Sequence, residues 1–243
     1  FTLLQGIDLQ IGAGKVTAIL GPNGAGKTSL LRLLTGELLP SSGEIFFNGA
    51  QLSHWQPKQL AKMLSVLPQG SQLNFPFTAR EVVMMGRIPH VTGLVKDTEI
   101  VDAALSAVGA SYLDKRFYPQ MSGGEKQRVQ LARVLAQIWE PDASGDRFLI
   151  LDEPTSSFDL AHQQLTLEIV RGFARQGVGV LMVIHDLNLA AGCADQLVML
   201  SCGKIAAQGS PETVLTNAMI KDVFNVDASI GLHPKTGSPL VIV

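Results

Sequence analysis

A glycine-rich segment near the start of the chain has the residue types and spacing of a phosphate-binding loop. Its residues are Gly21, Pro22, Asn23, Gly24, Ala25, Gly26, Lys27 and Thr28, followed by Ser29. They fit the pattern Gly-x-x-x-x-Gly-Lys-Thr/Ser, with an apolar run before them and a helical pattern after them. The glycines let backbone N–H groups curl around a phosphate chain, Lys27 can reach the outer phosphates, and the Thr28 hydroxyl can ligate Mg²⁺. Segment 21–29 therefore predicts a triphosphate site rather than a glycine-rich turn that binds nothing.

Two neighbouring acids, Asp152 and Glu153, end an apolar run over residues 148–151. A buried strand would hold Asp152 rigidly near a metal ion, and Glu153 at its tip could polarise a water for in-line attack. On its own the pattern could also be a strand that ends in a solvated acidic turn. Downstream of a phosphate loop, the catalytic interpretation is favoured.

The segment Met121–Glu125 places a serine and two glycines before a strong helical pattern. Exposed N–H groups and the positive end of the helix dipole could form a second anion site there. The alternative is an ordinary helix cap, because serine is a favoured capping residue. A chain with one triphosphate loop has no evident internal use for a second phosphate site. The two sites make sense together if two chains face each other and each closes over the other's nucleotide.

Composition excludes several classes of protein. The chain has 243 residues, with 19 Lys and Arg against 21 Asp and Glu, and no basic run that would indicate a nucleic-acid surface. No apolar run approaches the roughly 20 residues of a membrane-spanning helix, so any membrane role is expected to act through a partner. Cys193 and Cys202 have neither metal-site nor disulfide spacing, which suits a reducing cytosol. The chain opens at Phe1 without a methionine, and we expect a segment upstream of it.

Strand-like runs alternate with helical ones, which predicts a mostly parallel α/β core interrupted by a helical subdomain. The expected strands are 3–11, 43–48, 65–67, 148–151, 178–184 and 196–200. The expected helices are 29–34, 56–64, 79–85, 97–108, 124–138, 161–175 and 187–193.

The motifs occur in the order found in ATP-binding cassette ATPases, and the chain resembles that family over essentially its whole length. The resemblance rests on the phosphate loop, Gln69 after a strand, Met121–Glu125, the Asp152-Glu153 strand end, Ser156-Ser157-Phe158-Asp159, and His185 after a strand. It implies a P-loop NTPase core of the RecA type with a mostly parallel sheet, an antiparallel β subdomain whose N-terminal part precedes Phe1, and an inserted helical signature subdomain. The whole of 1–243 would be one nucleotide-binding domain, with 1–74 and 139–243 as the core and 75–138 as the helical subdomain.

The resemblance also implies a role for each matching residue, with ATP and Mg²⁺ as the cofactors. Gln69 would contact metal or water, Thr28 and Asp152 would ligate the metal, Glu153 would be the catalytic base, and His185 would contact the γ-phosphate.

Four residues would act across a homodimer of two such chains. Ser122, Gly123 and Gly124 would bind the γ-phosphate of the opposing chain, and Asp159 would lie at the dimer seam. Asp159 could equally cap the helix that follows it, and the two roles are compatible. The signature has Met121 and Glu125 where the family most often has Leu and Gln; neither change predicts a loss of activity.

Within the family the chain looks like the ATPases of iron-siderophore, cobalamin and hemin importers. This resemblance rests on residues 75–90 and on the segment His233-Pro234-Lys235-Thr236-Gly237. The segments 54–57 and 139–146 favour hemin, with lineage drift as the alternative. The resemblance then implies two transmembrane permease subunits, a periplasmic hemin-binding protein acting through the complex, and a peripheral place on the cytoplasmic face of the bacterial inner membrane. The alternatives are a ferric-siderophore or cobalamin importer and, with less support, a soluble ATPase acting on nucleic acid.

Two further expectations concern a docking groove and heme ligation. Phe75 and Phe77, with Arg87 and His90, are predicted to line a groove that receives a helix of the membrane subunit; the alternative is that both rings are core. Direct heme ligation by His54 and His90 is not expected, because they are far apart and lack a haem-attachment pattern.

Overall fold

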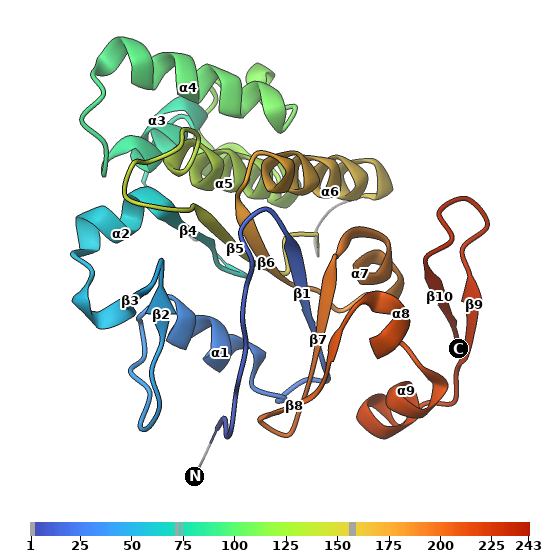
Figure 1. Cartoon of the computed structure of the whole chain (residues 1–243). Helices are drawn as coiled ribbons and strands as arrows, with labels where there is room; N and C mark the ends of the chain where they lie inside the picture. The colour runs from blue at the N-terminus through green and yellow to red at the C-terminus, as the bar shows by residue number, and fades with distance from the viewer. Residues whose placement is uncertain (1–2, 71–72, 74, 156–158) are drawn as a thin grey trace.

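A six-stranded sheet forms the centre of the molecule (Figure 1). This computed structural model describes residues 3–70, 73, 75–155 and 159–243. The strand order is β4-β5-β6-β1-β7-β8, and every pairing is parallel except that of β7 with β8. The strands are β1 (Val16–Leu20), β4 (Leu64–Leu67), β5 (Phe148–Asp152), β6 (Gly179–Val183), β7 (Gln196–Ser201) and β8 (Lys204–Gly209). The expected mostly parallel α/β core is confirmed.

Apolar side chains cover both faces of this sheet, which explains why its central strands are continuously apolar. Along β1, Val16, Ala18 and Leu20 belong to one buried cluster, while Ile19 belongs to a second cluster on the other face. The first cluster includes buried residues of α3 to α7, and the second includes those of α1 and the end of α2. Each strand is therefore fixed in register from two sides.

Nine helices occur in the part of the chain that the structure describes. They are α1 (Lys27–Leu34), α2 (Pro57–Met63), α3 (Ala79–Met84), α4 (Leu94–Ala107), α5 (Gly123–Gln137), α6 (Leu160–Arg175), α7 (Leu187–Cys193), α8 (Pro211–Val214) and α9 (Asn217–Phe224). The helices α3, α4 and α5 pack against one another at the upper left of Figure 1. Capping boxes at Thr78 and Ser122 begin α3 and α5, since each side chain accepts the N–H of a glutamate three residues on.

Two short antiparallel hairpins complete the fold. The strand expected over 43–48 is reduced to β2 (Phe46–Phe47), which pairs with β3 (Ala50–Gln51). Near the C-terminus, β9 (Ser229–Leu232) pairs with β10 (Pro239–Ile242), and the segment 233–237 forms their turn. Beyond residue 200 no helix or strand is expected from the sequence, so this part of the fold comes from the structure alone.

The strand expected over residues 3–11 is wrong. The segment forms no strand, and the backbone hydrogen bond that the structure gives it joins Gln5 N to Gly203 O at 2.8 Å. Its apolar residues Leu4, Ile7, Leu9 and Ile11 pack against the second cluster. The apolar spacing therefore indicated correctly that these side chains are buried. Burial of side chains does not require a ladder of backbone hydrogen bonds.

Candidate active site

The chemically active motifs meet at the carboxyl edge of the parallel strands. Strand register places Asp152 of β5 beside Val183 of β6, and Val183 beside Ile19 of β1. Glu153 follows this row by one residue, while His185 and Gly21 each follow it by two. Ligands of open α/β sheets bind outside this edge, so one site can draw on all three strands.

The phosphate loop joins β1 to α1, and its lysine is turned back onto the loop. Lys27 Nζ donates hydrogen bonds to the carbonyls of Gly21 at 2.8 Å and Pro22 at 3.0 Å. The residue is 8% exposed, and burial lowers its pKa, while the nearby charges of Glu153 and Asp152 act to raise it. Lys27 is thus a buried cation close to both acids.

Glu153 and His185 contact each other directly. His185 Nε2 lies 2.5 Å from Glu153 Oε1, and the two side chains are 48% and 16% exposed. Glu153 has a backbone φ of 51°, in the left-handed region that non-glycine residues rarely adopt, and its N–H is held by Val183 O at 3.1 Å. Such strain, on the order of 1–3 kcal/mol, persists where surrounding structure fixes it and gathers at functional sites.

The charges of the same side chains act on the pKa of Asp152. Burial raises its pKa, and the neighbouring Glu153 carboxylate raises it further, while Lys27 and His185 act to lower it. Four ionisable side chains, three at the ends of β5 and β6 and Lys27 at the start of α1, are therefore electrostatically linked. A bound cation near Asp152 would favour its ionised form.

The signature segment sits at the N-terminal end of α5. Ser122 Oγ accepts the N–H of Glu125 at 3.3 Å, and the Glu125 carboxylate accepts the N–H of Ser122 at 2.8 Å. These hydrogen bonds hold the pKa of Glu125 below its ordinary value. Ser122 and Gly123 are exposed, and nothing lies within 4 Å of where a Gly123 Cβ would stand. The cap interpretation is thus confirmed, and the end of the helix stays open for a second role.

Within the described ranges, the structure shows no hydrogen bond or ion pair from the predicted site residues Thr28, Gln69 and Asp159 to this centre. Thr28 and Gln69 are exposed, Gln69 at two residues beyond β4. Asp159 caps α6, where its carboxylate accepts the N–H of His162 at 2.9 Å and contacts His162 Nδ1 at 2.7 Å. Ser156, Ser157 and Phe158 lie outside the described residues. The roles of all these side chains toward a nucleotide stay predictions.

The position of Gln127 was not foreseen from the sequence. Gln127, on α5, donates to the carbonyl of Pro154 at 3.0 Å and lies 3.4 Å from that of Glu153. It ties the signature helix to the strained turn that carries the predicted base. A glutamine in a helical run gives no sequence signal for such a long-range contact.

The predicted groove around residues 75–90 wrongly includes Arg87, and the other three predicted residues differ in how exposed they are. Arg87 is 3% exposed and points inward, so it cannot line a docking surface. Phe77 is partly buried against the first cluster, Phe75 is 66% exposed, and His90 is half-buried with Nε2 2.7 Å from Gln137 O. A charged guanidinium with several inward partners is favoured inside the fold, which the sequence alone does not reveal.

Among the described residues, no helix is both long and apolar enough to cross a bilayer. Within the same residues, no group of three or more His, Cys, Asp or Glu is placed to hold a metal ion by itself. A metal at this site would therefore need other ligands, such as hydroxyl, amide or phosphate oxygens.

Comparison with known proteins gives a consistent picture. A family model described as ABC transporter matches residues 4–156. The hemin import ATP-binding protein HmuV of Pseudomonas putida is 50% identical over 240 residues, which cover 99% of this chain and 93% of that relative. The HmuV protein of Gloeobacter violaceus is 48% identical over 242 residues, which cover 99% and 88% of the two chains.

Solved structures share the fold. An inward-facing metal-chelate type ABC transporter superposes with a TM-score of 0.81 at 24% identity, over 100% of this chain and 92% of that one. A bacterial Atm1-family ABC exporter with ATP bound gives a TM-score of 0.74 at 29% identity, over 88% of this chain and 36% of that one. The expected P-loop NTPase fold and the resemblance to ATP-binding cassette ATPases are both confirmed, and ATP hydrolysis is the activity of such subunits. The chain belongs to the ABC transporter family.

Proposed function

We propose that this chain is the ATP-hydrolysing subunit of a hemin importer, working as a head-to-tail dimer on two membrane permease subunits. The observation that carries the proposal is the grouping of Lys27, Asp152, Glu153 and His185 at one edge of the sheet, with Glu153 and His185 2.5 Å apart. A buried cation beside two carboxylates and an imidazole suits activation of water at a bound triphosphate.

In the proposed reaction, a water attacks the γ-phosphorus of ATP and its proton passes to the Glu153 carboxylate. The bond from phosphorus to the β–γ bridging oxygen breaks, which releases ADP and phosphate. Lys27 exchanges its bonds to the Gly21 and Pro22 carbonyls for bonds to phosphate oxygens, which offsets the cost of its burial. His185 holds the Glu153 carboxylate and is exposed enough to contact the outer phosphate.

Magnesium fits the donor set at this edge. Thr28, Gln69 and Asp152 offer hydroxyl, amide and carboxylate oxygens, which are ligands that Mg²⁺ prefers, together with substrate phosphates. The raised pKa of Asp152 also marks a carboxylate that would gain from a nearby cation. When bound, the ion would neutralise charge on the phosphates. We assign these three residues to it.

The open end of α5 supports the proposed dimer. Ser122, Gly123 and Gly124 present a capped helix N-terminus to solvent, a geometry that favours anions. Ser122 exchanges hydrogen bonds with Glu125, and Glu125 also accepts from Arg116 and Tyr112; none of these contacts among the described residues reaches the phosphate loop of the same chain. We therefore assign this end to the γ-phosphate of an opposing chain, with Asp159 at the seam between the two.

The cargo assignment rests on the HmuV relatives, which are 46–50% identical over nearly the whole chain. In this proposal the subunit lies on the cytoplasmic face of the bacterial inner membrane, and a periplasmic hemin-binding protein delivers the cargo to the permeases. The division into a core of 1–74 and 139–243 and a helical subdomain of 75–138 is part of the same proposal.

Transport by the assembled complex tests the cargo. The chain is reconstituted with its permease pair and binding protein in vesicles, and uptake of hemin, a ferric siderophore and cobalamin is measured with ATP inside the same compartment as the chain. We expect ATP-dependent uptake of hemin alone, and none with Glu153→Gln. Uptake of a siderophore or cobalamin without hemin would replace hemin import with the corresponding alternative.

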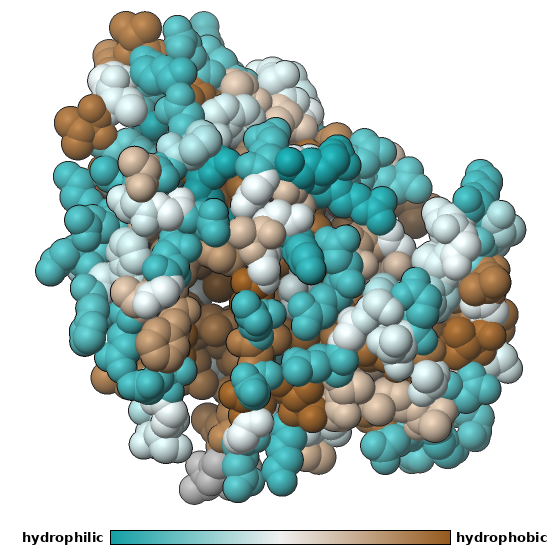
Figure 2. Space-filling view, viewed as in Figure 1, coloured by the Kyte–Doolittle hydropathy of each residue, from teal (hydrophilic) through white to brown (hydrophobic). Residues whose placement is uncertain are grey.

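We place the permease contact on an exposed apolar edge rather than on Arg87. Ile88, Val91, Leu94 and Val95 are 74%, 86%, 76% and 77% exposed and occupy one short stretch. Figure 2 shows apolar side chains at its upper left, over the start of α4. A run of exposed apolar residues marks a protein contact, and the contact that an ABC transporter ATPase requires is with its permease.

Paired variants test this edge. Val91→Asp should reduce hemin uptake by the assembled transporter while the isolated subunit keeps its ATPase rate. Leu39→Asp, at a residue 81% exposed elsewhere on the surface, is the matched control and should leave both unchanged. Normal uptake with Val91→Asp would remove this edge from the permease contact.

A further inference from the structure

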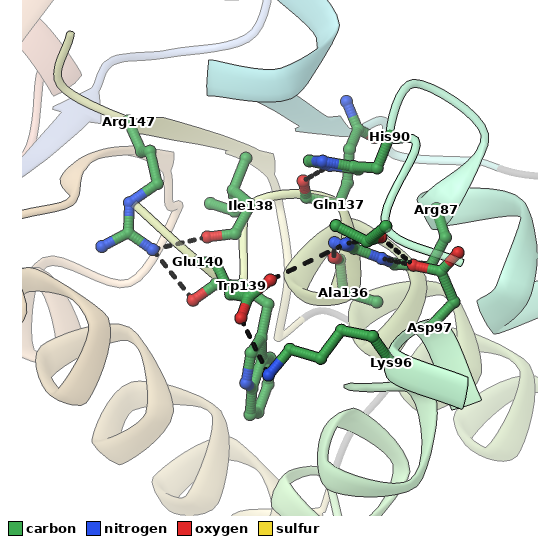
Figure 3. A network of polar contacts seen from close by, with 11 residues as sticks. Arg87, His90, Lys96, Asp97, Ala136, Gln137, Ile138, Trp139, Glu140 and Arg147 are labelled. Atoms are coloured by element: carbon green, nitrogen blue, oxygen red, sulfur yellow. Dashed lines mark hydrogen bonds and ion pairs between the residues drawn. The ribbon is translucent and has the colours of Figure 1, made fainter. Parts of the chain in front are cut away.

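Three basic side chains converge on the C-terminal end of α5 (Figure 3). Arg87, His90 and Arg147 reach the backbone carbonyls of residues 136, 137 and 138 in turn, each at 2.7 Å. The last carbonyls of a helix lack intrahelical partners, and positive charge is favourable beside them. This end of the helix is therefore fixed by side chains from two separate parts of the chain.

Arg87 is held by three hydrogen bonds and an ion pair. Its Nη1 donates to Ala136 O, its Nε donates to Asp97 Oδ1 at 2.9 Å, and its Nη2 donates to Thr92 Oγ1 at 3.1 Å. Asp97 also accepts the Thr92 hydroxyl at 2.6 Å, and its side chain is 15% exposed against 2% for Arg87. These contacts join the start of α4 to the end of α5 through one buried ion pair.

A close backbone approach adds to this attachment. Gly86 lies directly on α5, and a Cβ at this position would stand 2.2 Å from Arg133 O. Only glycine permits the two backbones to meet at this distance. Residues 86–90 are therefore attached to the last turn of α5 by both shape and hydrogen bonds.

The opposite end of the same helix carries the signature residues Ser122, Gly123 and Gly124. A helix of 15 residues is about 22 Å long, so a tilt of about 5° at the fixed end moves the other end by about 2 Å. Misplacement by about 1 Å at a reacting centre is enough to slow a reaction by about a hundredfold. The attachment at the C-terminal end thus controls where the signature residues lie.

We propose that Arg87 is a positioning residue for ATP hydrolysis: it fixes α5 so that the signature residues meet the nucleotide held by the opposing chain. This inference rests on the proposed head-to-tail dimer. The inference predicts different effects on ATP binding and on dimerisation, whereas a merely structural role would affect both. The phosphate loop of the same chain is attached to β1 and α1, so ATP binding by a single chain does not depend on Arg87, whereas ATP-driven dimerisation does.

Dimerisation in the Glu153→Gln background tests the inference. ATP affinity of the monomer and the ATP concentration that drives dimer formation are measured by equilibrium binding and analytical ultracentrifugation. With Arg87→Met added, we expect monomer affinity within twofold of the parent and at least a tenfold higher ATP requirement for the dimer. Arg87→Lys, which keeps the charge but not the forked donors, should fall between them.

A destabilised control separates positioning from loss of fold. Leu105→Ala removes a buried side chain of α4 without touching Arg87, so it should lower the melting temperature and leave dimerisation intact where the chain is folded. Should Arg87→Met fail to fold, Gly86→Ala perturbs the same attachment from the backbone side and should raise the ATP requirement. Normal ATP-driven dimerisation by folded Arg87→Met or Gly86→Ala would overturn the inference.

Mixed dimers decide whether Arg87 acts on the opposing chain. Arg87→Met is combined with Lys27→Ala, and ATPase is compared with that of wild type mixed with Lys27→Ala. In the mixed dimers of both mixtures, one site pairs an intact phosphate loop with an intact signature, so these dimers should hydrolyse ATP equally once the separately measured rate of the wild-type or Arg87→Met homodimers is subtracted. A much lower subtracted rate in the first mixture would mean that Arg87 acts within its own chain, which refutes the inference. If the Glu153→Gln parent does not dimerise with ATP at all, the proposed dimer fails first.

Discussion

The first glycine of the phosphate loop should be far less replaceable than the exposed glycine within it. Gly21 has a φ of 153°, and a Cβ there would stand 2.1 Å from Leu200 O, the carbonyl of a central strand. Gly24 has a φ of 78°, and nothing lies within 4 Å of where its Cβ would be. The same change to alanine therefore meets a backbone clash at one position and only a conformational cost at the other.

The magnitudes follow from these two geometries. Gly24→Ala should cost about 1–2 kcal/mol, the penalty of a left-handed conformation. Gly21→Ala should cost about 2–6 kcal/mol, from about 1–3 kcal/mol of backbone strain and about 1–3 kcal/mol of overpacking. For a chain of this size, the expected drops in melting temperature are roughly 2–8 °C and roughly 4–24 °C.

Thermal melts of the two variants and the wild type, followed by circular dichroism without nucleotide, provide the assay. Sizing checks that each variant is monomeric before heating, so that melting temperatures are compared between like species. If Gly21→Ala melts at or above Gly24→Ala, then the loop is not held against Leu200 and the reasoning is refuted.

Three further variants address the chemistry. Glu153→Gln should lower the ATPase rate by about 10²–10⁴-fold with ATP affinity retained, because the base is lost; wild-type turnover would exclude this role. Its melting temperature at neutral pH should not fall, because the Glu153 charge helps raise the pKa of Asp152, and ionised Asp152 costs stability above that pKa. Lys27→Ala should weaken ATP binding by about tenfold to a hundredfold through loss of a charged donor, and equal affinity by equilibrium binding would remove Lys27 from the site. Ser122→Arg should bind ATP as a monomer yet fail to dimerise in the Glu153→Gln background, and normal ATP-driven dimerisation there would contradict the two-chain site.

Much of the active edge was predictable because the motifs carry their own local structure. A glycine-rich loop after a buried strand, and acids at the end of another, point to the same edge of a parallel sheet wherever such strands pair. The direct contact between Glu153 and His185, and the strained backbone of Glu153, were not predictable, because they depend on how β5 and β6 align.

The sequence by itself determined the α/β alternation, the phosphate loop and the order of motifs that places the chain in its family. Periodicity indicates which side chains are buried, and motif residues indicate which chemistry is possible. Neither indicates which other part of the chain a segment will contact. For that reason, only the tertiary structure decided that residues 3–11 pack without forming a strand. It also decided that Arg87 turns inward, because the groups that satisfy its guanidinium lie as far as 49 residues away in the chain.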